Sequence, residues 1–124
     1  MNIMHITSRK AWIEATRAGQ YKAPSLEKEG LIHCSTYSQI LPVAEKYYKG
    51  QSDLVLLVID PMRLTQALKW EPPAEGTPPP GIRAGEVFPH IYGPINLDAV
   101  IQILDLETGP DDRFALPPSL RIDR

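Results

Sequence analysis

The chain has 124 residues, a formal net charge of −2 and 43% hydrophobic residues. Because typical domains hold roughly 100–150 residues, this length predicts one domain with a real hydrophobic core. The near-balanced charge argues against a nucleic-acid-binding protein that relies on a broad basic face. The chain has no apolar run long enough for a membrane span and no leader-like start, so we expect a cytoplasmic protein with no membrane contact.

The first half of the chain predicts three strands and two helices. Thr7 or Ser8 caps the first helix and Gly19 ends it, while Pro42 either breaks the second helix or delays its start. In chain order, the expected elements are a strand over 2–6, a helix to Ala18, a loop with one short turn over 21–30, a strand over 31–34, a helix from Ser35 or Thr36 to Gly50, and a strand over 54–59. The last strand is a continuous apolar run, which predicts burial on both faces.

The second half of the chain is rich in proline and glycine. In chain order, we expect a helical turn at Asp60-Pro61, a strand over 68–71, an exposed loop over 72–85, and strands over 87–92 and 100–106 joined by a turn near 96–98. The loop over 72–85 holds five prolines and three glycines, which disfavour both helix and strand. The sequence therefore predicts a single α+β domain over 1–106 and a loosely ordered C-terminal tail over 107–124.

The three histidines of the chain share one local pattern: His5-Ile6-Thr7, His33-Cys34-Ser35 and His90-Ile91-Tyr92. Residues two apart share one face of a strand, so each segment shows an imidazole and a hydroxyl on one side while its middle residue enters the core. If the three strands are neighbours, one surface carries all three imidazoles. Such a surface suits binding of ribose hydroxyls or a phosphate and proton transfer near neutral pH. Structural histidines that merely satisfy hydrogen bonds are the alternative.

Two carboxylates and one hydroxyl are further candidates for the site. Pro89 removes a ladder donor, which predicts an edge strand or a bulge, and bulges often re-aim side chains at active sites. Glu86 lies just before that strand and after the proline-rich loop, where a catalytic carboxylate can be presented. Glu71 ends a strand beside the aromatic Trp70. For both glutamates a solvated charge is the alternative. Ser25 begins a short turn whose terminal amides can bind an anion.

Two classes of site are disfavoured by the sequence. A zinc site would need three imidazoles from distant strands, without the short spacing of helical metal sites, so no metal is expected. Cys34 is the only cysteine, so it cannot form an internal disulfide. It alternates away from His33, and we expect it to face the core as a small apolar group instead of acting as a nucleophile.

Several motifs together are similar to the bacterial family called domain of unknown function 952. They are His5-Ile6-Thr7, Trp12, Ser25-Leu26, Glu29 to Thr36, Asp53 to Leu57, Trp70-Glu71 and Phe88 to Pro94. The similarity covers about residues 2–105 in unbroken order and departs in 74–85 and after Glu107. That family resembles the ADP-ribosyltransferase fold, which implies a split, bent, mostly antiparallel β-sheet with small flanking helices.

The resemblance also implies roles for particular residues. Within the superfamily, His5-Ile6-Thr7 looks like the His-Gly-Thr of the opening strand of RNA 2′-phosphotransferases, and Ile32 to Ser35 looks like their Val-His-Leu-Ser. In such proteins the first histidine contacts the ribose of the adenosine half of NAD. A later glutamate polarises the nicotinamide ribose, and Glu86 is the positional candidate here.

We therefore expect a small protein that binds NAD, or a related small-molecule nucleotide, in a His-lined cleft, with ADP-ribose transfer as the reaction that the resemblance implies. The expected catalytic groups are Glu86 and His33, and the expected binding residues are His5, Thr7, Ser25, Ser35, Glu71, His90 and Tyr92, with Tyr92 stacked on an aromatic base. A non-catalytic nucleotide- or metabolite-binding module and a structural or interaction protein stay open as alternatives. The acceptor of a transfer is unknown.

Overall fold

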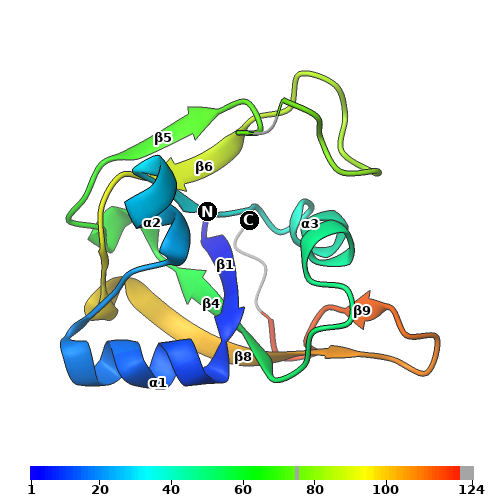
Figure 1. The fold of residues 1–124 in the computed structure, drawn as a ribbon, viewed down its shortest axis with the longest axis horizontal. Helices are drawn as coiled ribbons and strands as arrows, with labels where there is room; N and C mark the ends of the chain where they lie inside the picture. The colour runs from blue at the N-terminus through cyan, green and yellow to red at the C-terminus, as the bar shows by residue number, and fades with distance from the viewer. Residues whose placement is uncertain (75, 121–124) are drawn as a thin grey trace.

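A computed structural model describes residues 1–74 and 76–120 (Figure 1). The strands are β1 (Ile3–Ser8), β2 (Gln20–Tyr21), β3 (Ile32–His33), β4 (Leu54–Ile59), β5 (Leu68–Glu71), β6 (Phe88–Ile91), β7 (Ile95–Asn96), β8 (Val100–Thr108) and β9 (Phe114–Ala115). The helices are α1 (Arg9–Ala18), α2 (Pro24–Glu29) and α3 (Ile40–Tyr47), with 3-10 turns η1 (Pro61–Arg63) and η2 (Leu97–Ala99). The fold is α+β, as the sequence predicts.

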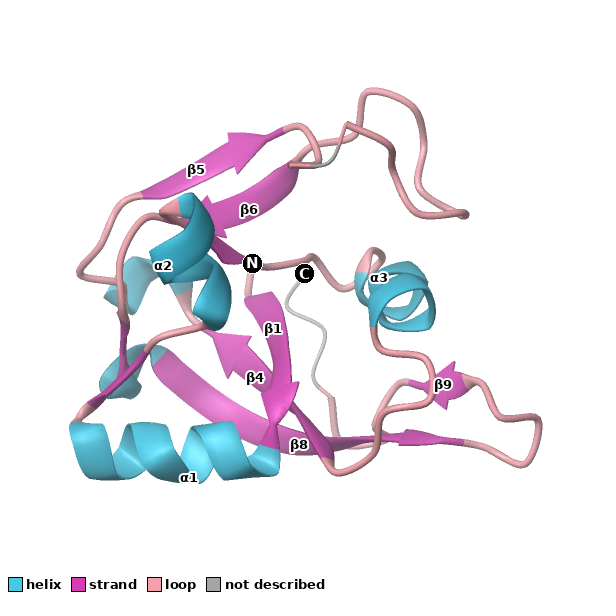
Figure 2. Cartoon of the chain, viewed as in Figure 1, coloured by secondary structure: helices cyan, strands magenta, loops and turns pink. Residues whose placement is uncertain are grey.

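One curled antiparallel sheet dominates the fold and forms a half-barrel in the order β1-β4-β8-β9. Two smaller antiparallel sheets, β2-β7 and β3-β6-β5, complete the architecture. Figure 2 shows β5 and β6 side by side. An isolated bridge between Met4 and Ser35 connects β1 to the segment after β3. The predicted bent, mostly antiparallel sheet with small flanking helices is confirmed, and the short β2-β7 pair is an addition that the sequence pattern did not indicate.

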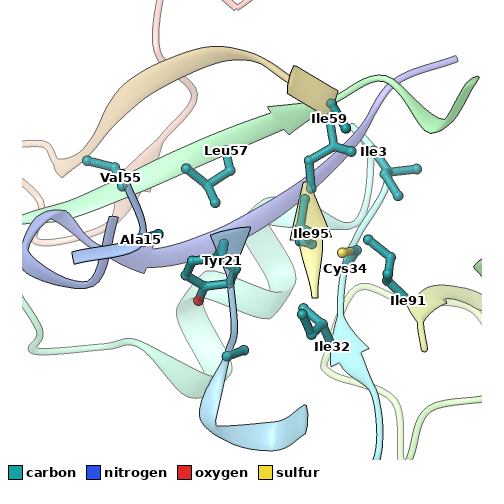
Figure 3. Packing of buried hydrophobic residues seen from close by; sticks show 12 residues of the cluster. Ile3, Ala15, Tyr21, Ile32, Cys34, Val55, Leu57, Ile59, Ile91 and Ile95 are labelled. Atoms are coloured by element: carbon teal, nitrogen blue, oxygen red, sulfur yellow. The ribbon is translucent and has the colours of Figure 1, made fainter. Parts of the chain in front are cut away.

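Strand β4 is buried on both faces, and each face belongs to a different apolar cluster. Val55, Leu57 and Ile59 face the cluster that α1, β2, β3 and β7 complete (Figure 3). Leu54, Leu56 and Val58 face the other cluster, where the sheet packs on α3 and β9. The continuous apolar run of β4 is explained by this double burial, which confirms the prediction for residues 54–59.

The two longer helices begin and end where local chemistry dictates. The Ser8 side chain accepts a hydrogen bond from the Ala11 amide of α1 at 3.0 Å, and Gly19 ends the helix in a left-handed conformation with φ of 88°. Helix α3 starts late, at Ile40, and Pro42 therefore lies in the first turn, where no intrahelical amide donor is needed. Of the two outcomes expected at Pro42, the delayed start is the one observed.

Pro89 lies in the central strand of the small sheet, which contradicts the prediction of an edge strand or bulge. Strand β6 pairs with β5 on one side and with β3 on the other. The Pro89 carbonyl accepts the Cys34 amide at 3.0 Å, but proline has no amide to return the bond. The named β3–β6 ladder accordingly stops at the His33–His90 pair. The missing donor thus ends a ladder in the middle of the sheet.

The sequence predicts a loose tail after Glu107. Between Glu107 and Leu120, the structure instead contains the end of β8 and the paired strand β9. Strand β8 continues to Thr108, and β9 folds back to pair with it. The ring of Phe114 is only 6% exposed in the cluster below α3, and its amide donates to Glu45 at 2.6 Å. The burial of this aromatic side chain is not indicated by the local sequence pattern. Residues 121–124 of the predicted tail lie outside the described residues.

Candidate functional site

His33 and His90 lie opposite each other in the β3–β6 ladder. Directly opposed residues of an antiparallel pair point to the same face, so both imidazoles stand on one side of the small sheet. Their ring centroids are 5.4 Å apart, and the rings meet edge to face. The structure thus brings together two of the three histidines that the sequence placed on a common surface.

A carboxylate holds each of these two imidazoles. Nε2 of His33 lies 3.1 and 3.2 Å from the two carboxylate oxygens of Glu29, at the end of α2. Nδ1 of His90 lies 2.8 Å from Oε1 of Glu71, in β5. Tyr92 donates a hydrogen bond of 2.5 Å to the same Glu71 oxygen. Each ring is therefore fixed through one nitrogen, which leaves its other nitrogen for a further partner.

The charge on Glu71 is stabilised by its neighbours. The hydrogen bond from Tyr92, and next the hydrogen bond with His90, hold the pKa of the Glu71 carboxyl below its usual value. The same hydrogen bond raises the pKa of the Tyr92 phenol above its usual value, because the Glu71 carboxylate holds the phenol proton. The pair is thus a carboxylate and a neutral phenol at physiological pH.

Nε2 of His90 is the free nitrogen of a nearly buried ring. His90 is 3% exposed, and Nδ1 is its only ring nitrogen with a hydrogen bond to a described residue. His90 lines a cavity, which is the open space beside this ring.

A cavity of about 370 Å³ adjoins the two imidazoles. It lies between the side of β1 that faces α3, helix α3 itself, the β3–β6 pair and the proline-rich loop. Its lining residues are Met4, Ile6, Glu29, His33, Ser35, Ile40, Val43, Tyr47, Tyr48, Pro73, Ala74, Pro79, Phe88 and His90. The polar groups gather on one wall, and the remaining walls are apolar and aromatic. Pockets for small organic ligands commonly have this composition.

His5 does not share this surface, contrary to the prediction. Met4, not His5, is the residue of β1 that stands opposite Ser35, so Met4 and Ile6 face the cavity with His33 and Ser35. A shift of register by one residue sends every side chain of a strand to the other face. The predicted burial of the middle residues Ile6, Cys34 and Ile91 is correct, but Ile6 enters the opposite cluster from the other two. The three histidine motifs therefore do not align.

His5 is instead sealed beneath the site, with both ring nitrogens bonded. Nδ1 lies 2.6 Å from the His33 carbonyl oxygen, and Nε2 lies 2.8 Å from the Tyr21 hydroxyl, which is also 2.9 Å from Oγ1 of Thr7. Because a carbonyl only accepts, Nδ1 is the ring nitrogen that carries a proton and donates it to the His33 carbonyl. Burial lowers the pKa of His5 to about 4, which keeps the ring neutral. His5 thus supports the backbone of β3, and neither His5 nor Thr7 is among the residues that line the cavity.

Glu86 also lies away from the cavity lining. Its Oε2 accepts a hydrogen bond of 2.8 Å from Nε2 of Gln39, a side chain that is only 2% exposed. The same Gln39 nitrogen donates to the Val87 carbonyl at 2.8 Å, and its Oε1 accepts the Thr36 amide at 3.0 Å. Glu86 therefore ties the end of the proline-rich loop to the start of α3, a structural task that sequence alone did not indicate.

Three other predicted binding residues have mixed outcomes. Ser35 lines the cavity at 3% exposure. Ser25 lies in α2 and is not among the lining residues, and Tyr92 stands behind Glu71 instead of facing the cavity. Helix α3 and Glu29 also line the cavity, and neither contribution was predicted from the sequence. The spacing of Ile40, Val43 and Tyr47 along one helical face is the sequence signal that could have indicated the contribution of α3.

Metal and thiol chemistry find no support among the described residues. No group of three or more His, Cys, Asp or Glu side chains there could hold a metal ion. Cys34 is 3% exposed, and burial raises the pKa of its thiol far above the usual value. The expectation that Cys34 faces the core is confirmed. None of the helices in the described ranges combines the length and apolar character that a membrane span requires.

Comparison with known proteins identifies the family. The family described as protein of unknown function (DUF952) matches residues 6–103. The chain belongs to this family. A crystal structure of protein CC0527 from Caulobacter crescentus has a TM-score of 0.78 and 31% identity over 93% of this chain and 94% of that chain. A solution NMR structure of CC0527 has a TM-score of 0.71 and 32% identity over 90% of each chain. No match is found among the curated proteins.

Proposed function

We propose that this DUF952 protein binds NAD, or a related nucleotide, by placing one nucleoside half in the cavity beside His33 and His90. The observation that carries the proposal is that two carboxylate-held imidazoles occupy one wall of an otherwise apolar and aromatic cavity. The cavity volume of about 370 Å³ is near the lower end of the roughly 300–1,000 Å³ of small-molecule sites. This size suits a single nucleoside better than a whole dinucleotide.

The lining residues supply what a nucleoside requires. Ser35, Glu29 and Nε2 of His90 offer hydroxyl, carboxylate and imidazole partners for ribose hydroxyls. Tyr48 and Phe88 offer aromatic surface for the base. The sequence predicts that His5 contacts the ribose directly. In this proposal the residues of the cavity wall make that contact, and His5 supports the backbone at His33. We also propose that the fold is related to the ADP-ribosyltransferase fold. The curled antiparallel sheet beside small helices supports this relationship.

ADP-ribose transfer is the second candidate function, and the observation that favours it is the position of Glu29 on the cavity wall beside His33. In such a transfer the bond between C1′ of the ribose and the nicotinamide nitrogen breaks, and its electron pair leaves with nicotinamide. The acceptor atom bonds to C1′ and gives its proton to His33. Glu29 stabilises the positive charge that develops on the ribose, the role that the sequence analysis gave to Glu86.

Titration calorimetry with NAD, ADP-ribose, adenosine and nicotinamide riboside tests this proposal. We expect saturable binding to the wild type and losses of about tenfold in His90→Ala and Ser35→Ala, since a polar contact contributes about 1–3 kcal/mol. Ser25→Ala is the control, because Ser25 lies outside the cavity lining. Binding of none of the four compounds overturns the proposal and favours a structural protein.

Transfer is tested separately by the release of nicotinamide from NAD. We expect Glu29→Gln to abolish the release while Glu86→Gln retains it. Binding of NAD without nicotinamide release in the wild type overturns the transfer and favours a non-catalytic binding module.

A further inference from the structure

The charge of the cavity wall restricts which part of a nucleotide can enter. None of the described residues that line the cavity is a lysine or arginine, while Glu29 is one of them. Glu71 lies directly behind His90 and is held as a carboxylate. A phosphate group inside the cavity would face these negative charges at close range with no cation beside it. The phosphates of a bound nucleotide must therefore project out of the cavity.

Lys46 is a cation next to this cavity, although it is not one of the lining residues. Its Nζ lies 5.1 Å from the ring centroid of Tyr47, which is a lining residue. It comes from α3, which also gives the cavity its Ile40 and Val43 side chains. Lys46 is exposed to solvent, so a charged ligand group can reach it without entering the cavity.

The same ammonium group bridges α3 and the proline-rich loop. Nζ of Lys46 donates a hydrogen bond of 3.3 Å to the Thr77 carbonyl, and the neighbouring Pro73, Ala74 and Pro79 line the cavity. An ammonium group has three donors, and Thr77 takes one of them. The other two can bind the oxygens of an anion that lies over the seam between the helix and the loop.

We infer that Lys46 forms, beside the cavity, an anion subsite that binds the phosphate or pyrophosphate group of a ligand whose nucleoside half occupies the cavity. This inference rests on the proposed nucleotide binding and adds to it the residue that distinguishes a nucleotide from a nucleoside. Lys46 binds the part of the ligand that His33 and His90 cannot accept. The ligand thereby contacts both α3 and the loop.

Calorimetric affinities of nucleoside and nucleotide pairs test the inference: adenosine against ADP-ribose, and nicotinamide riboside against NAD. We expect Lys46→Gln to weaken the binding of ADP-ribose and NAD about fivefold, as for the loss of an exposed charge-assisted contact. The affinities for the two nucleosides should be unchanged. Lys46→Arg should retain the preference for nucleotides. Lys10→Gln, on the exposed face of α1, is the matched control and should change no affinity.

Raised salt provides a second readout. The advantage of the nucleotides over the nucleosides should shrink with salt in the wild type and should be insensitive to salt in Lys46→Gln. Equal losses for nucleosides and nucleotides in Lys46→Gln, or no loss for either, overturn the inference while the proposed function stands. Binding of none of the four compounds to the wild type overturns both.

Discussion

Nδ1 of His5 lies 2.6 Å from the carbonyl oxygen of His33, so the buried imidazole of β1 supports the backbone from which the site imidazole of β3 projects. His5 lies on the side of β1 that is turned away from the cavity. It is neutral and enclosed, with its second nitrogen bonded to Tyr21, and His33 stands on the cavity wall. His5 is therefore a positioning residue for the site.

The burial of His5 should make the stability of the fold depend on pH. Its pKa is about 4 in the folded state against 6.5 for an ordinary histidine, so the unfolded chain binds the extra proton between these values. Stability contributed by His5 is complete above pH 6.5 and is lost as the pH falls toward 4. We expect a loss of about 3 kcal/mol in the free energy of unfolding between pH 7 and pH 4 from this residue.

Urea unfolding at a series of pH values measures this effect. His5→Gln should be less stable than the wild type at pH 7, because it loses a buried imidazole that bonds two partners. Its free energy of unfolding should, however, depend less steeply on pH between 6.5 and 4. The same slope in both proteins would show that His5 is not buried as a neutral ring.

The Tyr92–Glu71 hydrogen bond gives a second prediction. Tyr92→Phe removes the largest of the contacts that lower the pKa of Glu71, so the pKa of this carboxyl should rise toward its usual 4.5. Carbon-13 NMR titration of the side-chain carboxyl measures the change. Tyr37→Phe is the control, since it leaves the Tyr92–Glu71 contact in place. If the pKa of Glu71 is the same in Tyr92→Phe and in the wild type, Tyr92 does not form this hydrogen bond with Glu71.

Gln39 should be a stability determinant although it is polar. Its side chain is 2% exposed and bonds the Thr36 amide, the Glu86 carboxylate and the Val87 carbonyl. Gln39→Ala leaves buried partners unpaired, so we expect a loss of about 2 kcal/mol and faster amide exchange at Thr36. The exposed Gln51→Ala should change stability by less than about 0.5 kcal/mol. Equal effects of the two substitutions would refute the role of Gln39.

Phe114 tests whether the C-terminal segment is part of the fold. Its ring is 6% exposed in the cluster under α3. Phe114→Ala should therefore lower the free energy of unfolding by about 3 kcal/mol, as removal of a buried aromatic ring does. Ala115→Ser, at the exposed neighbouring position, should be close to neutral. If chemical unfolding finds Phe114→Ala as stable as the wild type, the segment after Glu107 is the loose tail that the sequence predicts.

Local chemistry made much of the fold predictable. The cap at Ser8 and the stop at Gly19 fix α1, and the apolar run of β4 predicts its bounds and its burial on both faces. The two-residue strands β2 and β7 carry no such pattern, because two residues are too few to show alternation. The pairing of Phe114 with the sheet likewise depends on a contact with α3 that is distant in sequence.

The site was only half predictable for a related reason. Alternation indicates which residues of one strand share a face, and it correctly grouped His33 with Ser35. It does not indicate how two strands align, and the Met4–Ser35 bridge set His5 on the opposite face. Glu86 was misplaced because its partner, Gln39, lies in another segment of the chain. Tertiary register, not local pattern, decides these positions.

The central claim is that the wall formed by His33 and His90 binds a nucleotide. Chemical-shift mapping by NMR during titration with NAD tests it most directly. We predict saturable shifts concentrated at His33, Ser35, Tyr48 and His90. No saturable shift, or shifts concentrated on the opposite face around Tyr21 and α1, would contradict the claim.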